Sequence, residues 1–166
     1  MNRNDRFVHP DTLMHRRPQA WATLKGSALY PSIVGTVRFY AHPYGVLIVT
    51  EVEGLPKPDG VCASPVFAFH IHEGSFCTGD EKDPFANTQM HYNPLGCRHP
   101  FHAGDLPPLF GANGYVFSAC LTDRFALHEI IGRTVVLHSS PDDFTTQPSG
   151  NAGTKIACGE IMGRIR

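Results

Sequence analysis

Hydrophobic and polar positions alternate along much of the chain after Trp21, in runs that are too short for long helices. The clearest run covers residues 33–40, in which Ile33, Gly35, Val37 and Phe39 alternate with Val34, Thr36, Arg38 and Tyr40. A period of two is typical of β-strands, because successive side chains point to opposite faces of a sheet. Similar runs, bounded by glycine, proline and other turn residues, predict strands at Ala22–Gly26, Ile33–Tyr40, Val46–Val52, Val66–His72, Tyr115–Leu121, Thr134–His138 and Ile156–Ile165.

The segment between His72 and Tyr115 lacks this pattern. It is about forty residues long, has no sustained helical period, and contains Pro84, Pro94, Pro100, Pro107 and Pro108. Structureless stretches of this length are uncommon inside compact domains and are usually functional. We therefore expect a long loop that a metal ion or a disulfide holds in place. Further along, only Asp123–Glu129 could form a brief helix.

These patterns predict an all-β chain with several strands and two long loops. The length of 166 residues is that of one domain. Residues 1–20 are polar, and we expect them to form an N-terminal extension that is loose or lies across the surface. Residues 21–166 then form the β-domain.

The charge of the chain and the lack of long apolar runs argue against two classes of partner. Its 14 Lys and Arg and 15 Asp and Glu give a net charge of −1, which excludes an overall basic surface for nucleic acid. No run approaches the roughly 20 apolar residues of a membrane span, so we expect no membrane partner.

The N-terminus lacks the apolar segment of a secretory signal, which predicts a cytoplasmic location. Five cysteines would also fit an oxidising compartment, so an extracytoplasmic location stays open.

Histidine is the residue type that the composition singles out: the chain has ten, and five lie between positions 70 and 102. His70 and His72 share one face of a predicted strand, and two neighbouring imidazoles form half of the square-planar nitrogen site that copper(II) prefers. His99, His102 and Asp105 lie within seven residues and could supply most of a tetrahedral zinc site. Each group taken singly has a structural alternative, either histidines in a core or on a surface or a polar loop with a stabilising aspartate.

Five motifs read together favour one explanation. They are Phe69-His70-Ile71-His72-Glu73, His91-Tyr92-Asn93-Pro94, His102-Ala103-Gly104-Asp105-Leu106, the run from Ile131 to His138 and the run from Gly150 to Gly159. In this order they resemble the copper/zinc superoxide dismutase family, over about 140 residues from Ala22 to Ile161. The resemblance implies a Greek-key β-sandwich or flattened barrel of about eight antiparallel strands with two long functional loops.

The resemblance also implies a site for two metal ions. Copper would be held by His70, His72, His91 and His138, and zinc by His91, His99, His102 and Asp105. His91 would therefore bridge the two ions. Asp142 would link His70 to His99 and fix the orientation of both rings. The structural alternative for Asp142 is an ordinary residue of a loop turn.

Two of the five cysteines match the family's disulfide within one subunit. Cys77, five residues past His72 as in bacterial members, would pair with Cys158 across 80 intervening residues. Such a bridge stabilises a fold by about 4 kcal/mol in the loop-entropy model. Cys62, Cys97 and Cys120 stay unassigned. We expect Cys120 to be a buried free thiol, whereas Cys97 is a loop thiol, a fifth metal donor or a partner in a second disulfide.

The chain departs from the family's pattern in three places. Only Pro100 and Phe101 separate His99 from His102, where most members have a substantial loop. Lys155 stands where the family has an arginine that attracts the anion; lysine keeps the charge but loses the planar, bidentate geometry. The loop from Ser139 to Gly150 contains no lysine, so we expect weaker long-range attraction of an anionic substrate.

The function implied by the resemblance is the conversion of two superoxide ions and two protons into O₂ and H₂O₂. Copper would cycle between two oxidation states, with zinc as a structural ion that is itself redox-silent. The catalytic residues would be His91, which supplies a proton to the departing peroxide, and Lys155, which attracts superoxide. One alternative is a copper/zinc-binding or buffering protein on the same scaffold with little dismutase activity. Another is a structural domain with a degenerate site, against which the complete ligand set argues. A homodimer stays open.

Overall fold

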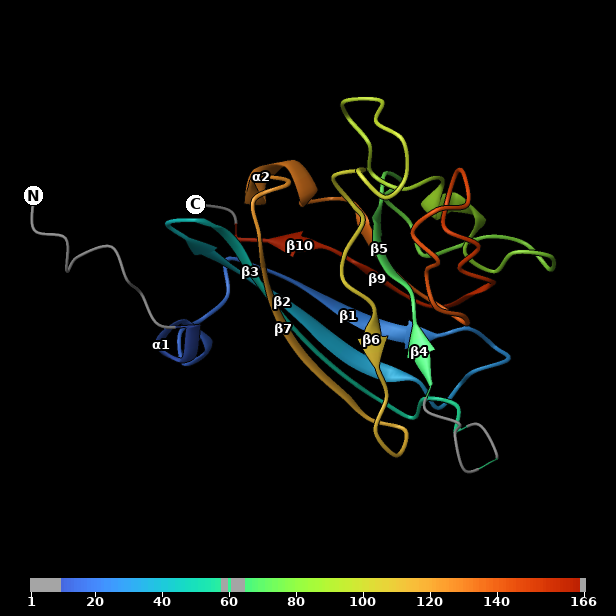
Figure 1. Ribbon diagram of the computed structural model, residues 1–166. Helices are drawn as coiled ribbons and strands as arrows, with labels where there is room; N and C mark the ends of the chain where they lie inside the picture. Colours follow the sequence, from blue (N-terminus) through green and yellow to red (C-terminus); the bar gives the residue numbers. More distant parts are fainter. Residues whose placement is uncertain (1–9, 58–59, 61–64, 165–166) are drawn as a thin grey trace, which may run out of the picture.

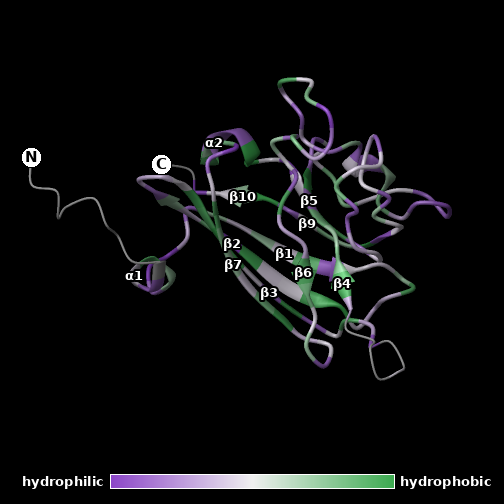
Figure 2. Cartoon of the chain, in the orientation of Figure 1, coloured by the Kyte–Doolittle hydropathy of each residue, from purple (hydrophilic) through white to green (hydrophobic). Residues whose placement is uncertain are grey.

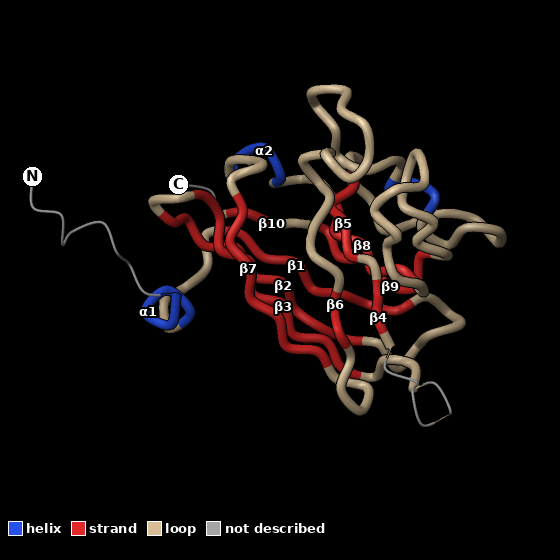
Figure 3. Tube along the Cα trace, in the orientation of Figure 1, coloured by secondary structure: helices blue, strands red, loops and turns tan. Residues whose placement is uncertain are grey.

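A computed structural model describes residues 10–57, 60 and 65–164 of the chain, and the expectation for Cys62 lies outside them. The helices and strands in chain order are α1 (Pro10–Met14), β1 (Ala20–Gly26), β2 (Val34–His42), β3 (Gly45–Glu53), β4 (Val66–Phe67), β5 (Phe69–His72), the 3₁₀ helix η2 (Ala86–Thr88), β6 (Leu109–Phe110), β7 (Val116–Thr122), α2 (Leu127–Ile130), β8 (Thr134–His138), β9 (Lys155–Glu160) and β10 (Met162–Gly163). Strands dominate and the helices are short (Figure 3). None of the helices in this part of the chain is long and apolar enough to cross a membrane.

Eight of the strands form one curled antiparallel sheet. Seven lie in the order β5-β8-β9-β1-β2-β3-β7, and β10 pairs with β1 at Ala20 and Trp21. β4 and β6 form a separate two-stranded antiparallel sheet, and their residues Phe67 and Leu109 pack into the same core as the main sheet. Between β7 and β8 the chain crosses, through α2, from one end of the main sheet to the strand beside its other end. The expected all-β fold with antiparallel strands is confirmed.

The predicted strands are present, and two of them are interrupted. The segment Val66–His72 breaks at Ala68, whose backbone pairs with Ser140 and His138 instead of continuing one ladder. The C-terminal segment breaks at Ile161, whose backbone pairs with Gly132 and Arg133. The brief helix expected within Asp123–Glu129 is shifted to Leu127–Ile130. The short strand β6 has too few residues to show an alternating pattern.

The core lies inside the curl of the sheet. Alternate residues of β1, among them Ala22 and Leu24, are buried while their neighbours are exposed, as the period of two requires. β5 and β8 are buried along their whole length, because they lie between the core and the long loops. Figure 2 shows hydrophobic residues following the strands and hydrophilic stretches along the loops.

The helix α1 covers part of the outer face of the sheet. Leu13 packs on Tyr40, Leu47 and Val49, which lie on adjacent strands β2 and β3 and are all nearly inaccessible to solvent. A five-residue helix is not stable alone, so this contact with the sheet holds α1 in place. Residues 1–9 lie outside the described part of the chain, and the boundary of the N-terminal extension stays a prediction.

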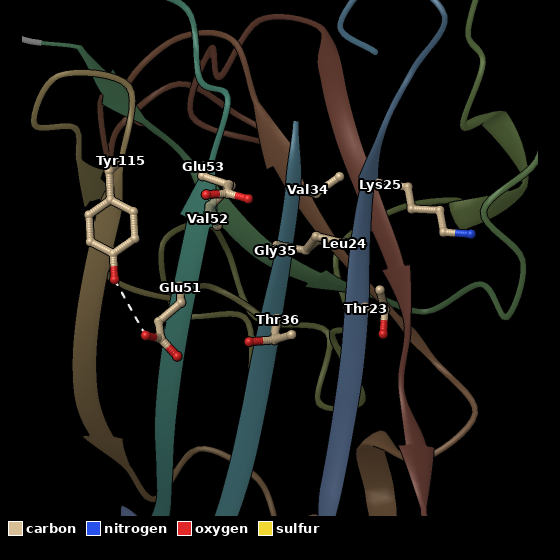
Figure 4. A pocket seen from close by; sticks show the side chains of 10 residues that line it. All are labelled: Thr23, Leu24, Lys25, Val34, Gly35, Thr36, Glu51, Val52, Glu53 and Tyr115. Atoms are coloured by element: carbon tan, nitrogen blue, oxygen red, sulfur yellow. Dashed lines mark hydrogen bonds between the residues drawn. The ribbon is translucent and has the colours of Figure 1, made fainter. Parts of the chain in front are cut away.

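The surface has a pocket of about 450 Å³ over one end of β1, β2 and β3, shown in Figure 4. Its lining includes Lys25 and Glu53, and Tyr115 donates a long hydrogen bond of 3.4 Å to Glu51. The lining contains none of the histidines predicted to bind metal. The predicted metal ligands lie elsewhere, on β5, β8 and the two long loops, which lie side by side next to β5 in Figure 1.

Candidate metal centre

The long loop after β5 returns to β5 and pairs with its free edge. His91 forms an isolated bridge with His72, and Asp105 forms one with His70. Between these bridges the backbone of Ile71 accepts a hydrogen bond from Tyr92 at 2.8 Å and donates one to Gly104 at 2.9 Å. The loop satisfies polar groups that an edge strand leaves unpaired. Ligands that lie far apart in the sequence are brought together beside one strand as a result.

Four histidines meet at this edge. His70 and His72 lie on β5, His138 ends the neighbouring β8, and His91 comes from the loop. Each side chain offers one nitrogen, and these atoms lie within 4.8 Å of one another. The Nε2 atoms of His72 and His138 are 3.3 Å apart, and the ring centroids of His70 and His91 are 4.0 Å apart. All four side chains are buried, with exposed fractions of 4% or less.

A second buried group shares His91 and adds His99, His102 and Asp105. The Nδ1 atoms of the three rings converge on the Asp105 carboxylate, at 2.8 Å for His91, 3.0 Å for His99 and 3.4 Å for His102. The carboxylate also accepts a 3.0 Å hydrogen bond from the backbone amide of His102, which fixes its direction. Three imidazoles and a carboxylate around one point are a donor set of the kind that binds Zn²⁺.

Asp142 connects the two groups from the second long loop. Its carboxylate accepts a 2.8 Å hydrogen bond from Nε2 of His70 at one oxygen and a 2.8 Å hydrogen bond from Nε2 of His99 at the other. The backbone amide of Phe144 donates a third, at 2.7 Å. Gly150 leaves the space for this arrangement: a Cβ on it would lie 2.0 Å from the Asp142 carboxylate and 2.6 Å from His99.

These hydrogen bonds decide which ring nitrogens are available to a metal ion. Because a carboxylate only accepts, His70 carries its proton at Nε2, which leaves a lone pair at Nδ1. His72 donates from Nδ1 to the carbonyl of Gln89 at 2.8 Å, which leaves Nε2. Nδ1 of His70 and Nε2 of His91 are buried and have no hydrogen-bond partner among the described residues. Buried polar atoms are rarely left unpaired, so the free nitrogens fit copper at the four-histidine group.

Burial keeps the rings of His70, His72 and His138 neutral. Burial lowers the pKa of His70, and it lowers the pKa of His72 and His138 well below the ordinary histidine value, with neighbouring histidines adding to the effect. Neutral imidazole is the form that binds a metal ion. Burial alone would raise the pKa of Asp105 and Asp142, but hydrogen bonds from the surrounding rings outweigh it and lower the pKa of both. Both carboxylates are thus ionised at neutral pH.

The expected disulfide between Cys77 and Cys158 is present, with a Cα–Cα distance of 5.6 Å. It ties the long loop to β9. Cys97 is exposed and free, and belongs to neither group of metal-ligand side chains. Cys120 is free as expected, but only partly buried; this burial raises the pKa of its thiol.

A pocket of about 310 Å³ opens onto the four-histidine group. His72, His91 and His138 line it together with Lys155 and Asp83. Lys155 does not point freely at the histidines, because its Nζ donates to the Asp83 carboxylate at 2.7 Å and to the carbonyl of Phe85 at 3.1 Å. Asp83 thus partly neutralises the positive charge of Lys155 at the pocket.

Several residues of the centre carry no signal in the sequence. Gln147 pairs with both backbone groups of His99: its side-chain oxygen accepts from the amide at 3.0 Å, and its nitrogen donates to the carbonyl at 2.7 Å. Asp83 and Lys82 lie at the pocket through the loop that the disulfide anchors. Arg124 binds three carbonyls of the loop 99–105. None of these belongs to a motif, because their roles depend on contacts between distant segments.

A curled antiparallel β-sheet with two buried donor groups that share one histidine defines this chain as a β-fold metalloprotein with a candidate centre for two ions. Comparison with known proteins identifies the family to which this chain belongs. The family model described as copper/zinc superoxide dismutase (SODC) matches residues 33–161. The chain belongs to this family.

Individual relatives agree with the family match. "Superoxide dismutase [Cu-Zn] 2" of Aquifex aeolicus is 33% identical over 145 residues, which cover 78% of this chain and 79% of that protein. "Superoxide dismutase [Cu-Zn]" of Legionella pneumophila is 34% identical over 140 residues and 79% of each chain. The structure of the Cu/Zn superoxide dismutase from Brucella abortus superposes with a TM-score of 0.71 at 25% identity, covering 85% of this chain and 98% of that one.

The chain is accordingly an oxidoreductase that disproportionates superoxide, and the family implies copper and zinc as its cofactors. The alternative of a copper/zinc buffering protein with little activity has no observation in its favour in the described part of the structure.

Proposed function

We propose that the two donor groups divide the work of superoxide disproportionation between them. Copper would be held by His70, His72, His91 and His138, and zinc by His91, His99, His102 and Asp105. The observation that carries this proposal is the geometry of two buried sets of four ligand atoms, each set within 4.8 Å, that have His91 in common.

Copper held at the first group would supply the one-electron couple that the disproportionation of superoxide needs. The reaction as a whole converts two O₂⁻ and two H⁺ into O₂ and H₂O₂. The protein has to admit a small anion, exclude other reductants and deliver protons. The pocket of about 310 Å³, lined by His72, His91 and His138, suits the first two tasks, since it reaches three of the four rings while all four side chains are at most 4% exposed.

His91 is suited to deliver a proton. Its Nε2 has no hydrogen-bond partner among the described residues, and the side chain lines the pocket. Its other nitrogen, Nδ1, is held beside Asp105 at 2.8 Å, which fixes the ring. When Nε2 is not bound to copper, it can hold a proton and give it to the departing peroxide. Asp142 keeps His70 and His99 in the tautomers that leave their metal-facing nitrogens free.

Lys155 attracts the substrate anion in this proposal, and Asp83 controls how strongly. Because Lys155 is paired with Asp83 at 2.7 Å, its field at the pocket is weaker than that of a free cation. Lys155→Arg should raise the rate at low salt, because arginine can serve Asp83 and the anion at once through its several donors. Salt should suppress the gain. An unchanged or lower rate would contradict this role.

The assignment is tested by loading the purified protein with copper and zinc and following the decay of a superoxide pulse. We expect rapid decay, and we expect His91→Ala to lose most of the activity and to weaken zinc retention. Zinc content that is unaltered in His91→Ala would refute the shared ligand. Copper bound stoichiometrically without superoxide decay would instead support the buffering protein.

Two further proposals concern the cellular compartment of the protein and its oligomeric state. We keep the cytoplasm as the location suggested by the sequence, with an extracytoplasmic location as the alternative that the Cys77–Cys158 disulfide favours. Fractionation of cells combined with alkylation of free thiols distinguishes them. We also propose a homodimer as the assembly, which light scattering during size-exclusion chromatography tests.

A further inference from the structure

The short loop between His99 and Asp105 is held largely by contacts from outside. Only Pro100 and Phe101 separate its two histidines. Within the turn, the amide of Asp105 donates to the carbonyl of His102 at a long 3.2 Å, and the amide of His102 donates to the Asp105 carboxylate at 3.0 Å. A loop this short has few internal bonds with which to fix three metal-facing groups. Its geometry must therefore depend on neighbouring segments.

Gln147 holds the His99 end of this loop, and Arg124 binds three carbonyls between Pro100 and Asp105. Gln147 pairs with both backbone groups of His99, as described above. Arg124 lies in the connection between β7 and α2, outside both long loops. Its Nη1 atom donates to the carbonyls of Pro100, His102 and Asp105, at 2.9, 3.2 and 3.1 Å.

A cation suits this convergence of three carbonyl oxygens. Oxygens that point at a common centre repel one another, and a guanidinium nitrogen at that centre turns the repulsion into charge-assisted hydrogen bonds. Arg124 forms no ion pair with a carboxylate in the described part of the chain. Its charge is therefore committed to these carbonyls. Two of them belong to His102 and Asp105, whose side chains are in the second donor group.

We propose that Arg124 is a positioning residue for zinc: it folds the shortened loop so that the His102 ring and the Asp105 carboxylate face the same point. The proposal rests on the proposed zinc group. It assigns Arg124 no contact with the metal or with superoxide. Its effect passes through the backbone of the two ligands, and replaces the internal support that a longer loop would give.

The main test is the zinc affinity of copper-free protein, measured by competition with a chromophoric chelator. We expect Arg124→Ala to weaken zinc binding about 10- to 100-fold, the usual effect of losing a residue that orients metal ligands. Arg124→Lys keeps the charge with fewer fixed donors and should lie between Arg124→Ala and the parent protein. Arg98→Ala is the matched control. Arg98 is exposed on the same loop, and its side chain has no hydrogen bond to the described residues. Its replacement by alanine removes the same charge as Arg124→Ala.

A spectroscopic readout separates positioning from general stability. Co²⁺ bound in place of zinc reports the ligand geometry through its visible absorption. We expect Arg124→Ala to change the shape and intensity of that spectrum, Arg124→Lys to restore part of it, and Arg98→Ala to leave it as in the parent. If Arg124→Ala does not fold, Arg124→Lys and Arg124→Gln carry the comparison. Lower thermal stability with unchanged zinc affinity and an unchanged Co²⁺ spectrum would overturn the proposal.

The failure of this inference differs from the failure of the proposed function. If the parent protein itself binds no zinc, or if His102→Ala binds zinc as the parent does, the zinc group is wrong whatever Arg124 does. If the parent binds zinc, His102→Ala does not, and Arg124→Ala matches Arg98→Ala, then only the role of Arg124 is wrong.

Discussion

Gly150→Ala tests how closely the second long loop is built around Asp142. Gly150 has a positive φ of 68°, and an added Cβ would lie 2.0 Å from the Asp142 carboxylate and 2.6 Å from His99. Ordinary van der Waals contact begins at 3.4 Å, so the carboxylate has to move by more than an ångström. That movement breaks its 2.8 Å hydrogen bonds to His70 and His99.

The magnitude has two parts. The left-handed backbone conformation costs a non-glycine residue about 1 kcal/mol. Each charge-assisted hydrogen bond that Asp142 loses costs roughly 1.5–3 kcal/mol, and solvent regained by the displaced carboxylate offsets part of this. We expect a free energy of unfolding about 4 kcal/mol lower for metal-free Gly150→Ala, and a zinc affinity about 10- to 100-fold weaker.

Gly132→Ala provides the control, because Gly132 also has a positive φ, 82°, but a Cβ there would have no atom within 4 Å. It should lose only the conformational part, about 1 kcal/mol, and none of the zinc affinity. Urea unfolding of the metal-free proteins measures the first quantity and chelator competition the second. Equal losses in the two variants would refute the reasoning, since they would show that Gly150 matters only for its backbone conformation.

Three further predictions concern the disulfide, the second loop and α1. Cys158→Ser should lower the free energy of unfolding by about 4 kcal/mol, and reduction of the disulfide in the parent should cause the same loss. The control Cys120→Ser should change the free energy of unfolding only slightly. Urea unfolding measures all three, and equal losses in Cys158→Ser and Cys120→Ser would contradict the prediction. Hydrogen bonds from Thr146 and Thr145 lower the pKa of Asp143 to about 2. Its stabilising contribution should therefore be complete above the ordinary carboxyl pKa of about 4 and disappear as the pH falls through about 2. A carboxyl NMR titration that gives about 4 for Asp143 would contradict this. Leu13→Ala should cost about 2 kcal/mol by uncovering the sheet face under α1, and a change within error would mean that α1 is not docked in solution.

The alternating pattern predicts most strands because burial on one face leaves a mark at every second residue. It places Thr134–His138 with the bounds that the structure gives. It runs past the breaks at Ala68 and Ile161, where the side-chain pattern continues but the backbone changes its partner. It also gives no signal for α1, because five residues are too few for a helical period and the helix depends on Leu13 packing against the sheet.

The amino-acid sequence alone identifies the side-chain types of the candidate centre and their order, because the spacing of imidazoles and carboxylates is local in motifs such as His70-Ile71-His72. What surrounds these side chains follows only from the folded structure. Three sets of contacts join distant segments. Lys155 pairs with Asp83 over 72 positions, and Gln147 binds the backbone of His99 over 48 positions. Arg124 binds three carbonyls that lie at least 19 positions away. Contacts of this kind leave no local pattern, since a lone polar residue in a loop looks the same whether it faces solvent or orients a metal ligand.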